Sequence, residues 1–329
     1  MSDAHPRDRF DLLPDQDAER AFVDALGQGR LHHAWMLTGV EGVGKAGFAY
    51  RAARRLLGAA PDPSRGVLGA RPDDPVSRLI SAQSHPDLLV LEREGEGARI
   101  KRNISVDQAR ELPEFFAKSP SRARYRVAVI DAADDLNMNA ANALLKVLEE
   151  PPERGVLFLV THAPGRLLPT IRSRCRRLAF PNWSLEALRD LVAQRTGMAA
   201  GEAERIAAMA SGSPGAALML AGDQMLDLDR LARGWVLEGG PDAAAEMAQA
   251  ARFRGAEGGE NFDRLFDRLL AAVKARAMES TGREAALWSE AWSRLSVMPD
   301  QVAGINLDRA DVLAAAMAEI GRLQRQAGG

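Results

Sequence analysis

The sequence predicts an α/β protein whose parallel sheet is covered by helices on both faces and is followed by an all-helical region. Short apolar segments alternate with helical periodicity between residues 30 and 180, which is typical of parallel strands joined by helices. A glycine-rich loop at residues 39–46 lies between a predicted strand and a predicted helix, the context in which such loops bind phosphate. After Pro181 the strand-like segments stop and helical periodicity continues alone.

The composition limits the kind of protein. A chain of 329 residues favours two or three domains. A net charge of −2 gives no overall basic field, so any contact with DNA must come from a local patch. Cys175 is the only cysteine, which excludes an internal disulfide and a cysteine-based zinc cage and fits a reducing cytoplasm. Residues Met1–Phe10 contain no apolar signal core, and no segment reaches membrane-spanning length, so we expect no membrane partner.

Each element of the α/β region follows from its periodicity or from residues that end it. Ser105 is a predicted N-cap that opens one helix, and Pro151 and Pro152 end another. The predicted strands are residues 34–38, 88–92, 126–131, 156–161 and 177–180. The predicted helices are residues 17–26, 46–58, 105–118, 139–150 and 167–172, with an irregular excursion at 59–74 and a charged hairpin or loop at 93–102.

Beyond Pro181 the sequence predicts helices. Three short ones, at 184–194, 202–210 and 214–220, form a small lid, and longer ones follow from Met225. Two apolar faces repeat at helical spacing: Phe262, Leu265, Phe266, Leu269, Leu270 and Val273, and then Leu313, Met317, Ile320 and Leu323. The Ala- and Gly-rich stretch at 239–259 is predicted to be a mobile connection. We predict three domains: an α/β domain at 1–182, a helical lid at 183–223 and a helical oligomerisation domain at 224–329.

The glycine-rich loop has most of the parts of a phosphate-binding loop. Gly39, Gly42 and Gly44 allow backbone N–H groups to curl around phosphates, and Lys45 would reach the β- and γ-oxygens. The next position normally carries Ser or Thr, whose hydroxyl holds Mg²⁺, but here it is Ala46. The sequence therefore predicts a vestigial site that keeps the phosphate cradle and lacks a metal ligand. Weak residual nucleotide binding stays open.

Two polar residues end predicted strands of the same sheet. Asp131 stands where the acidic motif of a P-loop ATPase helps to hold Mg²⁺, but Ala132 follows it instead of a Glu that would polarise water. The alternative is an Asp that simply caps the next segment. Thr161 ends the next strand, where a polar residue can sense the γ-phosphate, although a threonine there is also common for structural reasons.

Several arginines surround the tripeptide Ser173-Arg174-Cys175. One interpretation is a solvated basic turn. The other is an arginine finger, because a guanidinium is a planar, permanently charged fork that stabilises charge on a transferring phosphoryl group. A finger supplied to a neighbouring subunit needs no working site of its own, which would explain its retention beside a degenerate loop. We therefore predict that Arg174 is catalytic in trans.

Five stretches together resemble the delta-prime family of subunits of the bacterial DNA polymerase III clamp loader, a branch of the AAA+ proteins. They are Gly-Arg-Leu-His-His-Ala-Trp (29–35), Gly-Val-Glu-Gly-Val-Gly-Lys (39–45), the run from Asp131 to Pro152 that ends in Leu-Glu-Glu-Pro-Pro, Ser-Arg-Cys (173–175) and Gly-Ser-Pro-Gly-Ala-Ala-Leu (212–218). The C-terminal region matches only as a helical domain of suitable length.

The resemblance implies an AAA+ P-loop parallel sheet with a helical lid, followed by an all-α C-terminal collar domain. It implies a hetero-oligomer with motor (gamma/tau) subunits and a delta subunit, in which this chain gives Arg174 to a motor subunit while the complex loads a sliding clamp on primed DNA. Hydrolysing subunits would carry an Arg near Gly215 as a second phosphate sensor. Many clamp-loader subunits carry a cysteine-rich zinc module where residues 58–86 have no cysteine here, so we expect no zinc and no other cofactor.

Two other functions stay open. An active AAA+ ATPase, such as a motor-type clamp-loader subunit or a helicase loader, would need a hydroxyl at position 46, a Glu at 132 and an Arg near 215. A nucleotide kinase built on the same loop would need phosphate-clamping arginines and a closing lid, but not the long helical C-terminal region. The absence of all three residues, taken together with the resemblance, favours a non-hydrolysing clamp-loader subunit that acts in DNA replication in the cytoplasm.

Overall fold

The computed structural model describes residues 5–10, 16–93, 103–222, 225–237, 243–254, 258–299 and 308–327. The chain divides into two compact units, residues 1–219 and 220–329; the first holds the sheet and most of the predicted lid. The boundaries of the three predicted domains stay a prediction. Within the described ranges, no helix is both long enough and apolar enough to cross a bilayer.

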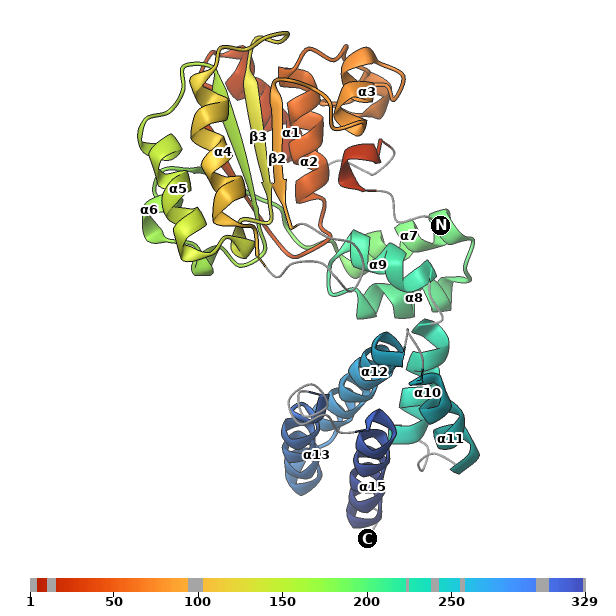
Figure 1. Ribbon diagram of the computed structural model, residues 1–329. Helices are drawn as coiled ribbons and strands as arrows, with labels where there is room; N and C mark the ends of the chain where they lie inside the picture. Colours follow the sequence, from red (N-terminus) through yellow and green to blue (C-terminus); the bar gives the residue numbers. More distant parts are fainter. Residues whose placement is uncertain are drawn as a thin grey trace. The chain divides into compact units, whose positions relative to one another are not determined.

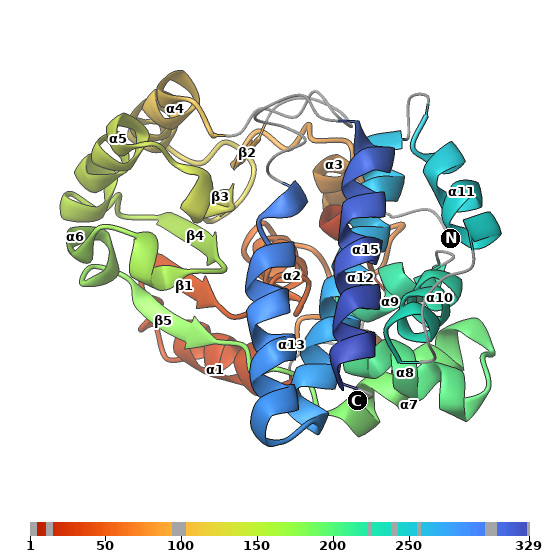
Figure 2. The same cartoon turned by 90° about the horizontal axis from the view of Figure 1, so that it is seen from below.

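The first unit is built on a sheet of five parallel strands in the order β2-β3-β4-β1-β5 (Figure 1, Figure 2). The strands are β1 Ala34–Thr38, β2 Leu88–Glu92, β3 Arg126–Asp131, β4 Gly155–Thr161 and β5 Arg176–Ala179. All the predicted strands are confirmed, and their ends shift by at most one residue. Because the strands run the same way, the residues that follow them meet at one edge of the sheet, which we call the carboxyl edge.

Helices cover both faces of this sheet (Figure 1). The described elements up to residue 222 are η1 Pro6–Asp8, α1 Gln16–Gly27, α2 Lys45–Leu56, η2 Pro63–Arg65, α3 Pro75–Ser81, α4 Val106–Ala117, η4 Ala133–Asp135, α5 Met138–Glu149, η5 Pro164–Arg166, α6 Pro169–Arg172, α7 Leu185–Thr196, α8 Ala200–Met209 and α9 Pro214–Gly222. Strand alternation divides the core between the two faces. Phe158 of β4 packs with Phe22 and Phe48 of α1 and α2, whereas Leu157 belongs to the opposite cluster with Leu144 of α5.

Helix α3 was not predicted from the sequence. Its seven residues are too few for apolar periodicity to show. Its start nevertheless carries a recognisable signal, because Asp74 accepts hydrogen bonds from the N–H groups of Val76 (2.9 Å) and Ser77 (3.3 Å), and Pro75 occupies the first helical turn.

The predicted N-cap of α4 is confirmed. The Ser105 hydroxyl accepts the N–H of Gln108 at 3.2 Å, and the Gln108 side chain accepts the N–H of Ser105 at 2.9 Å, which completes a capping box. The charged hairpin or loop predicted at 93–102 lies outside the described residues, apart from Arg93.

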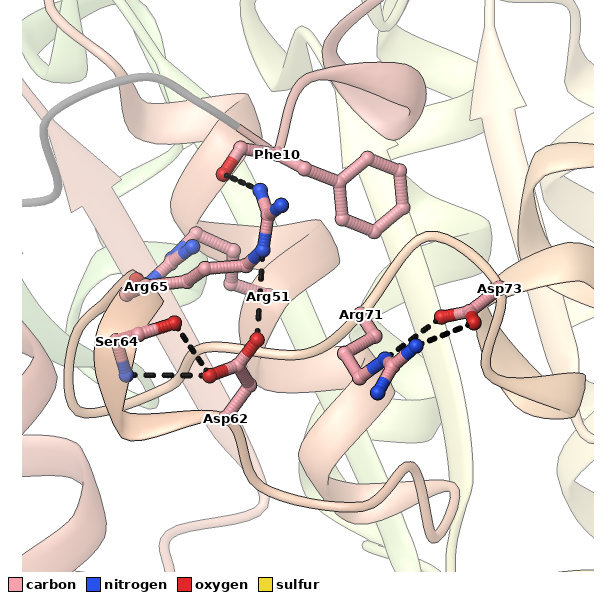
Figure 3. Close-up of polar contacts among 7 residues, drawn as sticks. All are labelled: Phe10, Arg51, Asp62, Ser64, Arg65, Arg71 and Asp73. Atoms are coloured by element: carbon pink, nitrogen blue, oxygen red, sulfur yellow. Dashed lines mark hydrogen bonds and ion pairs between the residues drawn. The ribbon is translucent and has the colours of Figure 1, made fainter.

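The excursion at residues 59–74 is held by carboxylates and arginines (Figure 3). Asp62 accepts hydrogen bonds from the N–H (3.1 Å) and the hydroxyl (2.6 Å) of Ser64. Arg65 lies 3.4 Å from Asp62 and donates to the carbonyl oxygen of Phe10 at 3.3 Å. The segment where the resemblance implies a lost zinc module therefore has polar contacts of its own.

A buried ion pair ties this excursion to two helices. Arg51 of α2 pairs with Glu19 of α1 at 2.5 Å, and Glu19 is fully buried. The second Glu19 oxygen accepts the N–H of Leu68 at 2.9 Å, and Arg51 donates to the carbonyl of Arg65 at 2.6 Å. These buried, hydrogen-bonded charges therefore anchor the excursion to α1 and α2.

The second unit is helical throughout its described part. Its helices are α10 Met225–Leu237, α11 Ala243–Arg252, α12 Gly258–Glu279, α13 Gly282–Leu295 and α15 Arg309–Ala327. Both predicted apolar faces lie in one core, which confirms them: Phe262, Leu265, Phe266, Leu269 and Val273 are buried with Leu313, Met317, Ile320 and Leu323, and Leu270 packs partly buried against them.

The prediction of a mobile connection at 239–259 is wrong for most of its described part. Helix α11 spans Ala243–Arg252, and α12 begins at Gly258. Alanine has the highest helix propensity, so a stretch rich in both Ala and Gly indicates a linker only where the glycines dominate. Residues 239–242 and 255–257 lie outside the described ranges.

Candidate functional site

The glycine loop follows β1 at the carboxyl edge and ends where α2 begins. Gly39, Gly42 and Gly44 have φ values of 152°, 73° and 110°, which residues with a side chain rarely adopt. Lys45 turns back onto this loop. Its Nζ donates hydrogen bonds to the carbonyl oxygens of Gly39 at 2.7 Å and Val40 at 2.6 Å, and the residue is 3% exposed. The charge of the lysine is therefore satisfied by the loop itself.

Burial also changes the proton affinity of this lysine. It lowers the pKa of Lys45 to about 8, although Asp131, Asp134 and Glu41 oppose the shift by their negative charge. The following residue, Ala46, packs partly buried against the hydrophobic core and has no oxygen to offer a metal ion. Before it could bind a phosphate, Lys45 would have to leave two short hydrogen bonds.

Asp131 ends β3 at the same edge and is paired in register with Glu92, which ends β2. Burial raises the pKa of Asp131, and the charge of Glu92 raises it further. Glu92 lies 3.1 Å from Nε2 of His5, and this hydrogen bond lowers the pKa of Glu92. Sequence reasoning missed Glu92 and His5, because they are 87 residues apart in the chain and meet only in the folded protein. Ala132 leaves Asp131 without an adjacent general base.

Thr161 ends β4 at this edge and is fully buried. Its hydroxyl donates to Asp134 at 2.6 Å, and Asp134 also accepts the N–H groups of His162 at 2.5 Å and Ala163 at 3.3 Å. The proton of Thr161 is thus committed to a neighbouring carboxylate that caps the turn after β4. Its predicted contact with a γ-phosphate stays a prediction.

The start of α9 lies directly on the glycine loop. The N–H of Gly215 donates to the carbonyl oxygen of Gly42 at 2.9 Å. A Cβ atom on Gly42 would stand 2.5 Å from Oγ of Ser213, and one on Gly215 would stand 2.9 Å from the Gly42 oxygen. Both positions therefore need glycine for a close approach of backbones. In the sequence, Gly215 stands where hydrolysing subunits would carry an arginine. The structure shows that it also packs against Gly42.

Arg174 lies at the opposite edge of the sheet. It precedes β5, whose first residue, Arg176, is paired with Trp35 near the start of β1. The glycine loop begins after β1 ends, about 13 Å further along that strand. The structure therefore groups Lys45 with the carboxylates of the carboxyl edge and leaves Arg174 away from them.

The contacts of Arg174 are few. Its Nη2 pairs with Glu149 at the end of α5 at 3.0 Å, and its Nη1 donates to the carbonyl oxygen of Thr170 at 3.0 Å. The side chains of Arg174 and Glu149 are 36% and 51% exposed. A guanidinium held in this way is accessible to another protein.

The described residues offer no evident metal centre. Within them, no three His, Cys, Asp or Glu side chains gather as ligands for an ion. Burial raises the pKa of the Cys175 thiol to about 12, which disfavours the thiolate that a metal requires. His32 and His33 stack with ring centroids 4.4 Å apart beside the start of β1. The expectation of no zinc and no other cofactor stays a prediction.

Sequence comparisons place these features in a family. The family described as "DNA polymerase III, delta subunit" matches residues 15–184. The chain is 37% identical over 230 residues to the DNA polymerase III subunit delta' of Pseudomonas aeruginosa, which covers 67% of this chain and 64% of that protein. It is 33% identical over 182 residues to the DNA polymerase III subunit gamma/tau of Mycobacterium tuberculosis, covering 54% of this chain and 30% of that protein. The matches therefore span less than two thirds of these relatives.

Comparison with solved structures concerns the fold. A DNA polymerase III gamma subunit-related protein from Thermotoga maritima superposes with a TM-score of 0.50 at 21% identity, over 92% of this chain and 99% of that one. This likeness supports the predicted fold class, an AAA+ P-loop sheet followed by helices. The family match spans more than half of the 329 residues. This chain therefore belongs to the delta-prime family of DNA polymerase III clamp-loader subunits.

Proposed function

We propose that this chain is a non-hydrolysing clamp-loader subunit that supplies Arg174 to the ATP site of a neighbouring motor (gamma/tau) subunit. The position of Arg174 carries the proposal. It is accessible and stands at the sheet edge away from its own glycine loop, so the phosphate it serves would belong to another chain. A delta subunit would complete the complex, which would load a sliding clamp on primed DNA during replication in the cytoplasm.

The state of the glycine loop supports the absence of hydrolysis. Lys45 is bound to its own loop, and Ala46 removes the oxygen that would hold Mg²⁺. Ala132 removes the carboxylate that would polarise water. Gly215 holds α9 against Gly42 where the resemblance implies an arginine in hydrolysing subunits. Metal binding, water activation and charge neutralisation each lack a residue.

The test is ATP hydrolysis by a loader reconstituted from this chain and its partner subunits. Arg174→Ala should lower clamp- and DNA-stimulated hydrolysis and slow clamp loading. A finger is worth roughly 10³–10⁵ at a single site in GTPase systems, but the loss here should be smaller because other sites keep their own. Arg174→Lys should rescue poorly, since an ammonium lacks the planar fork.

The matched control for this test is Arg172→Ala. Arg172 is an exposed arginine at the end of α6, two residues away, so it reports the loss of a positive charge from the same turn. It should leave hydrolysis and loading unchanged. If Arg174→Ala also leaves both rates unchanged, Arg174 is an ordinary surface arginine and the proposal fails.

An active ATPase is the second candidate, favoured by the retained Lys45 and Asp131 and by the gamma/tau relatives. We expect the purified chain to show no steady ATP turnover, because Ala46 and Ala132 remove the metal ligand and the base. Turnover that Lys45→Ala abolishes would establish this second candidate instead. A direct nucleotide-binding measurement on the same sample would show whether the loop retains weak affinity.

A further inference from the structure

A cavity of about 540 Å³ opens at the amino-terminal edge of the sheet, on the side away from the glycine loop. It lies between the ends of α1 and α2, helix α3, and the turns that precede β2 and β3. Part of its lining, which we call the apolar floor, consists of apolar side chains that include Leu26, Leu57, Val76 and Leu79. Its volume lies within the range of ligand-binding clefts in proteins. Neither the glycine loop nor Arg174 uses it.

The charged groups of this cavity all have one sign. Arg55, Arg122 and Arg124 line it, and none of its lining residues is Asp or Glu. In the part of the chain that the structure describes, none of these three guanidinium groups forms an ion pair. By contrast, Arg51 on the same helix as Arg55 is paired with Glu19. Uncompensated cations around an apolar floor favour a ligand that is both acidic and apolar.

A buried carboxylate holds the backbone of the turn that carries two of these arginines. Asp87 is fully buried and accepts the backbone N–H groups of Ser121 at 2.8 Å, Arg122 at 2.7 Å and Ala123 at 3.0 Å. The turn that carries Arg122 and Arg124 is therefore held before any ligand arrives. Such preorganisation reduces the entropy lost on binding.

We propose that this cavity binds an acidic peptide segment of a partner protein that carries an apolar side chain. The apolar side chain would enter between Leu26 and Val76, and the carboxylates would pair with Arg122 and Arg124 at the exposed rim. Arginine forks bind carboxylates through two parallel hydrogen bonds, which gives both strength and direction. A bare anion would make no use of the apolar floor, so the lining favours a peptide over a free ion.

The probe is a fluorescein-labelled peptide of sequence Asp-Leu-Asp-Phe-Asp-Leu, titrated with the full-length chain and followed by fluorescence anisotropy. We expect saturable binding that weakens as salt is raised. Two further peptides separate the two halves of the recognition: Asn-Leu-Asn-Phe-Asn-Leu removes the charge, and Asp-Ser-Asp-Ser-Asp-Ser removes the apolar side chains. Both should bind more weakly than the probe.

Charge reversal identifies the site. Arg122→Glu/Arg124→Glu should weaken binding at least about tenfold, because like charges then face the probe. The matched control is Arg205→Glu/Arg283→Glu, which makes the same change in net charge at exposed arginines outside the cavity. It should bind as the wild type does. All these side chains are exposed, and circular dichroism will verify that each variant is folded.

Val76→Trp provides an independent reading, since a large side chain would fill the floor without changing the charge. It should also weaken binding of the probe. The two charge-reversal variants, which remain folded, serve as comparisons. The proposal is overturned if the wild type shows no saturable binding, if the uncharged peptide binds equally well, or if the control reversal weakens binding as much as the cavity reversal. Displacement of the probe by inorganic phosphate at similar concentration would indicate a free-anion site and would also overturn it.

Discussion

Lys45 lies in the glycine loop with its ammonium group enclosed by protein and bonded to two carbonyl oxygens. Enclosure makes the charged form less favourable, so burial lowers the pKa of this side chain to about 8. The proposed finger, Arg174, shows the opposite situation. Its pair with Glu149 is exposed on both sides and contributes about 0–1 kcal/mol, so it can give way to a partner. Burial thus separates a residue committed to its own loop from one available to another chain.

The pKa of Lys45 makes a prediction about stability at alkaline pH. Below pH 8 the lysine is protonated in both the folded and the unfolded chain, so its contribution to the free energy of unfolding does not change with pH. Between about pH 8 and its usual value of 10.5, the unfolded chain binds more protons, so the free energy of unfolding should rise with pH. The rise attributable to Lys45 should approach about 3 kcal/mol.

Denaturant unfolding of the wild type and Lys45→Met across this pH range measures that contribution as a difference. Lys118→Met supplies the control, since Lys118 is an exposed lysine at the end of α4. The free energy of unfolding of the wild type should rise relative to that of Lys45→Met between pH 8 and 10.5. If the two free energies stay parallel there, the side chain is not enclosed as described.

At the scale of elements, the glycine loop is in close backbone contact with the start of α9. Gly42 and Gly215 approach so closely that the N–H of one reaches the carbonyl of the other. This contact connects the loop after β1 to a helix of the predicted lid within the first unit. A loop that must move to admit phosphate would first lose this contact. This contact therefore favours a subunit in which the predicted lid stays against the glycine loop.

Gly42→Ala tests the contact between the loop and α9. The new methyl group would meet Ser213 and a backbone nitrogen of α9, in addition to the strain of a φ of 73°. We expect a loss of roughly 1–3 kcal/mol in the free energy of unfolding of the first unit.

Gly29→Ala is the matched control, because Gly29 has a similar φ of 66° and nothing within 4 Å of its added Cβ. It should show the cost of the backbone strain alone. Equal destabilisation by the two substitutions would mean that the α9 contact contributes nothing.

At the scale of the whole molecule, both units expose large apolar side chains. The second unit exposes large apolar side chains, including Trp292 at 38% and Met278 at 78%. Lys274 and Met278 are one turn apart on α12, and the Lys274 ammonium lies 6.0 Å from the centre of the Trp292 ring. These residues form a mixed apolar and basic surface on α12 and α13. Such a surface is suited to packing against other subunits.

Trp292→Glu should therefore weaken assembly with partner subunits while leaving the fold intact. The side chain is partly exposed, so the substitution leaves the buried core of the unit in place, and a charge in its position would disfavour an apolar interface. Co-elution of the chain with its partners on size-exclusion chromatography measures the effect, with Arg283→Glu as an exposed control on the same helix. Normal co-elution of Trp292→Glu would remove this surface from the assembly.

Much of this protein could be read from its sequence by local rules. Short apolar segments that alternate with helical segments predicted every strand. Parallel strands that are buried on both faces consist of continuous apolar runs. Helical spacing predicted the faces from Phe262 and from Leu313, and Ser105 predicted the start of α4. The glycines and Lys45 marked the phosphate-type loop. Each of these signals lies within one short segment of the chain, where backbone geometry and periodicity determine the local structure.

The tertiary structure alone decided how these parts meet. The contact of Gly42 with Gly215 and the pairing of Glu19 with Arg51 join residues distant in sequence. No periodicity encodes such contacts, because they arise when strand order and helix packing bring separate segments together. The same packing places Arg174 at the edge of the sheet away from Lys45. A site made by packing depends on the whole fold, whereas an element depends on its own few residues.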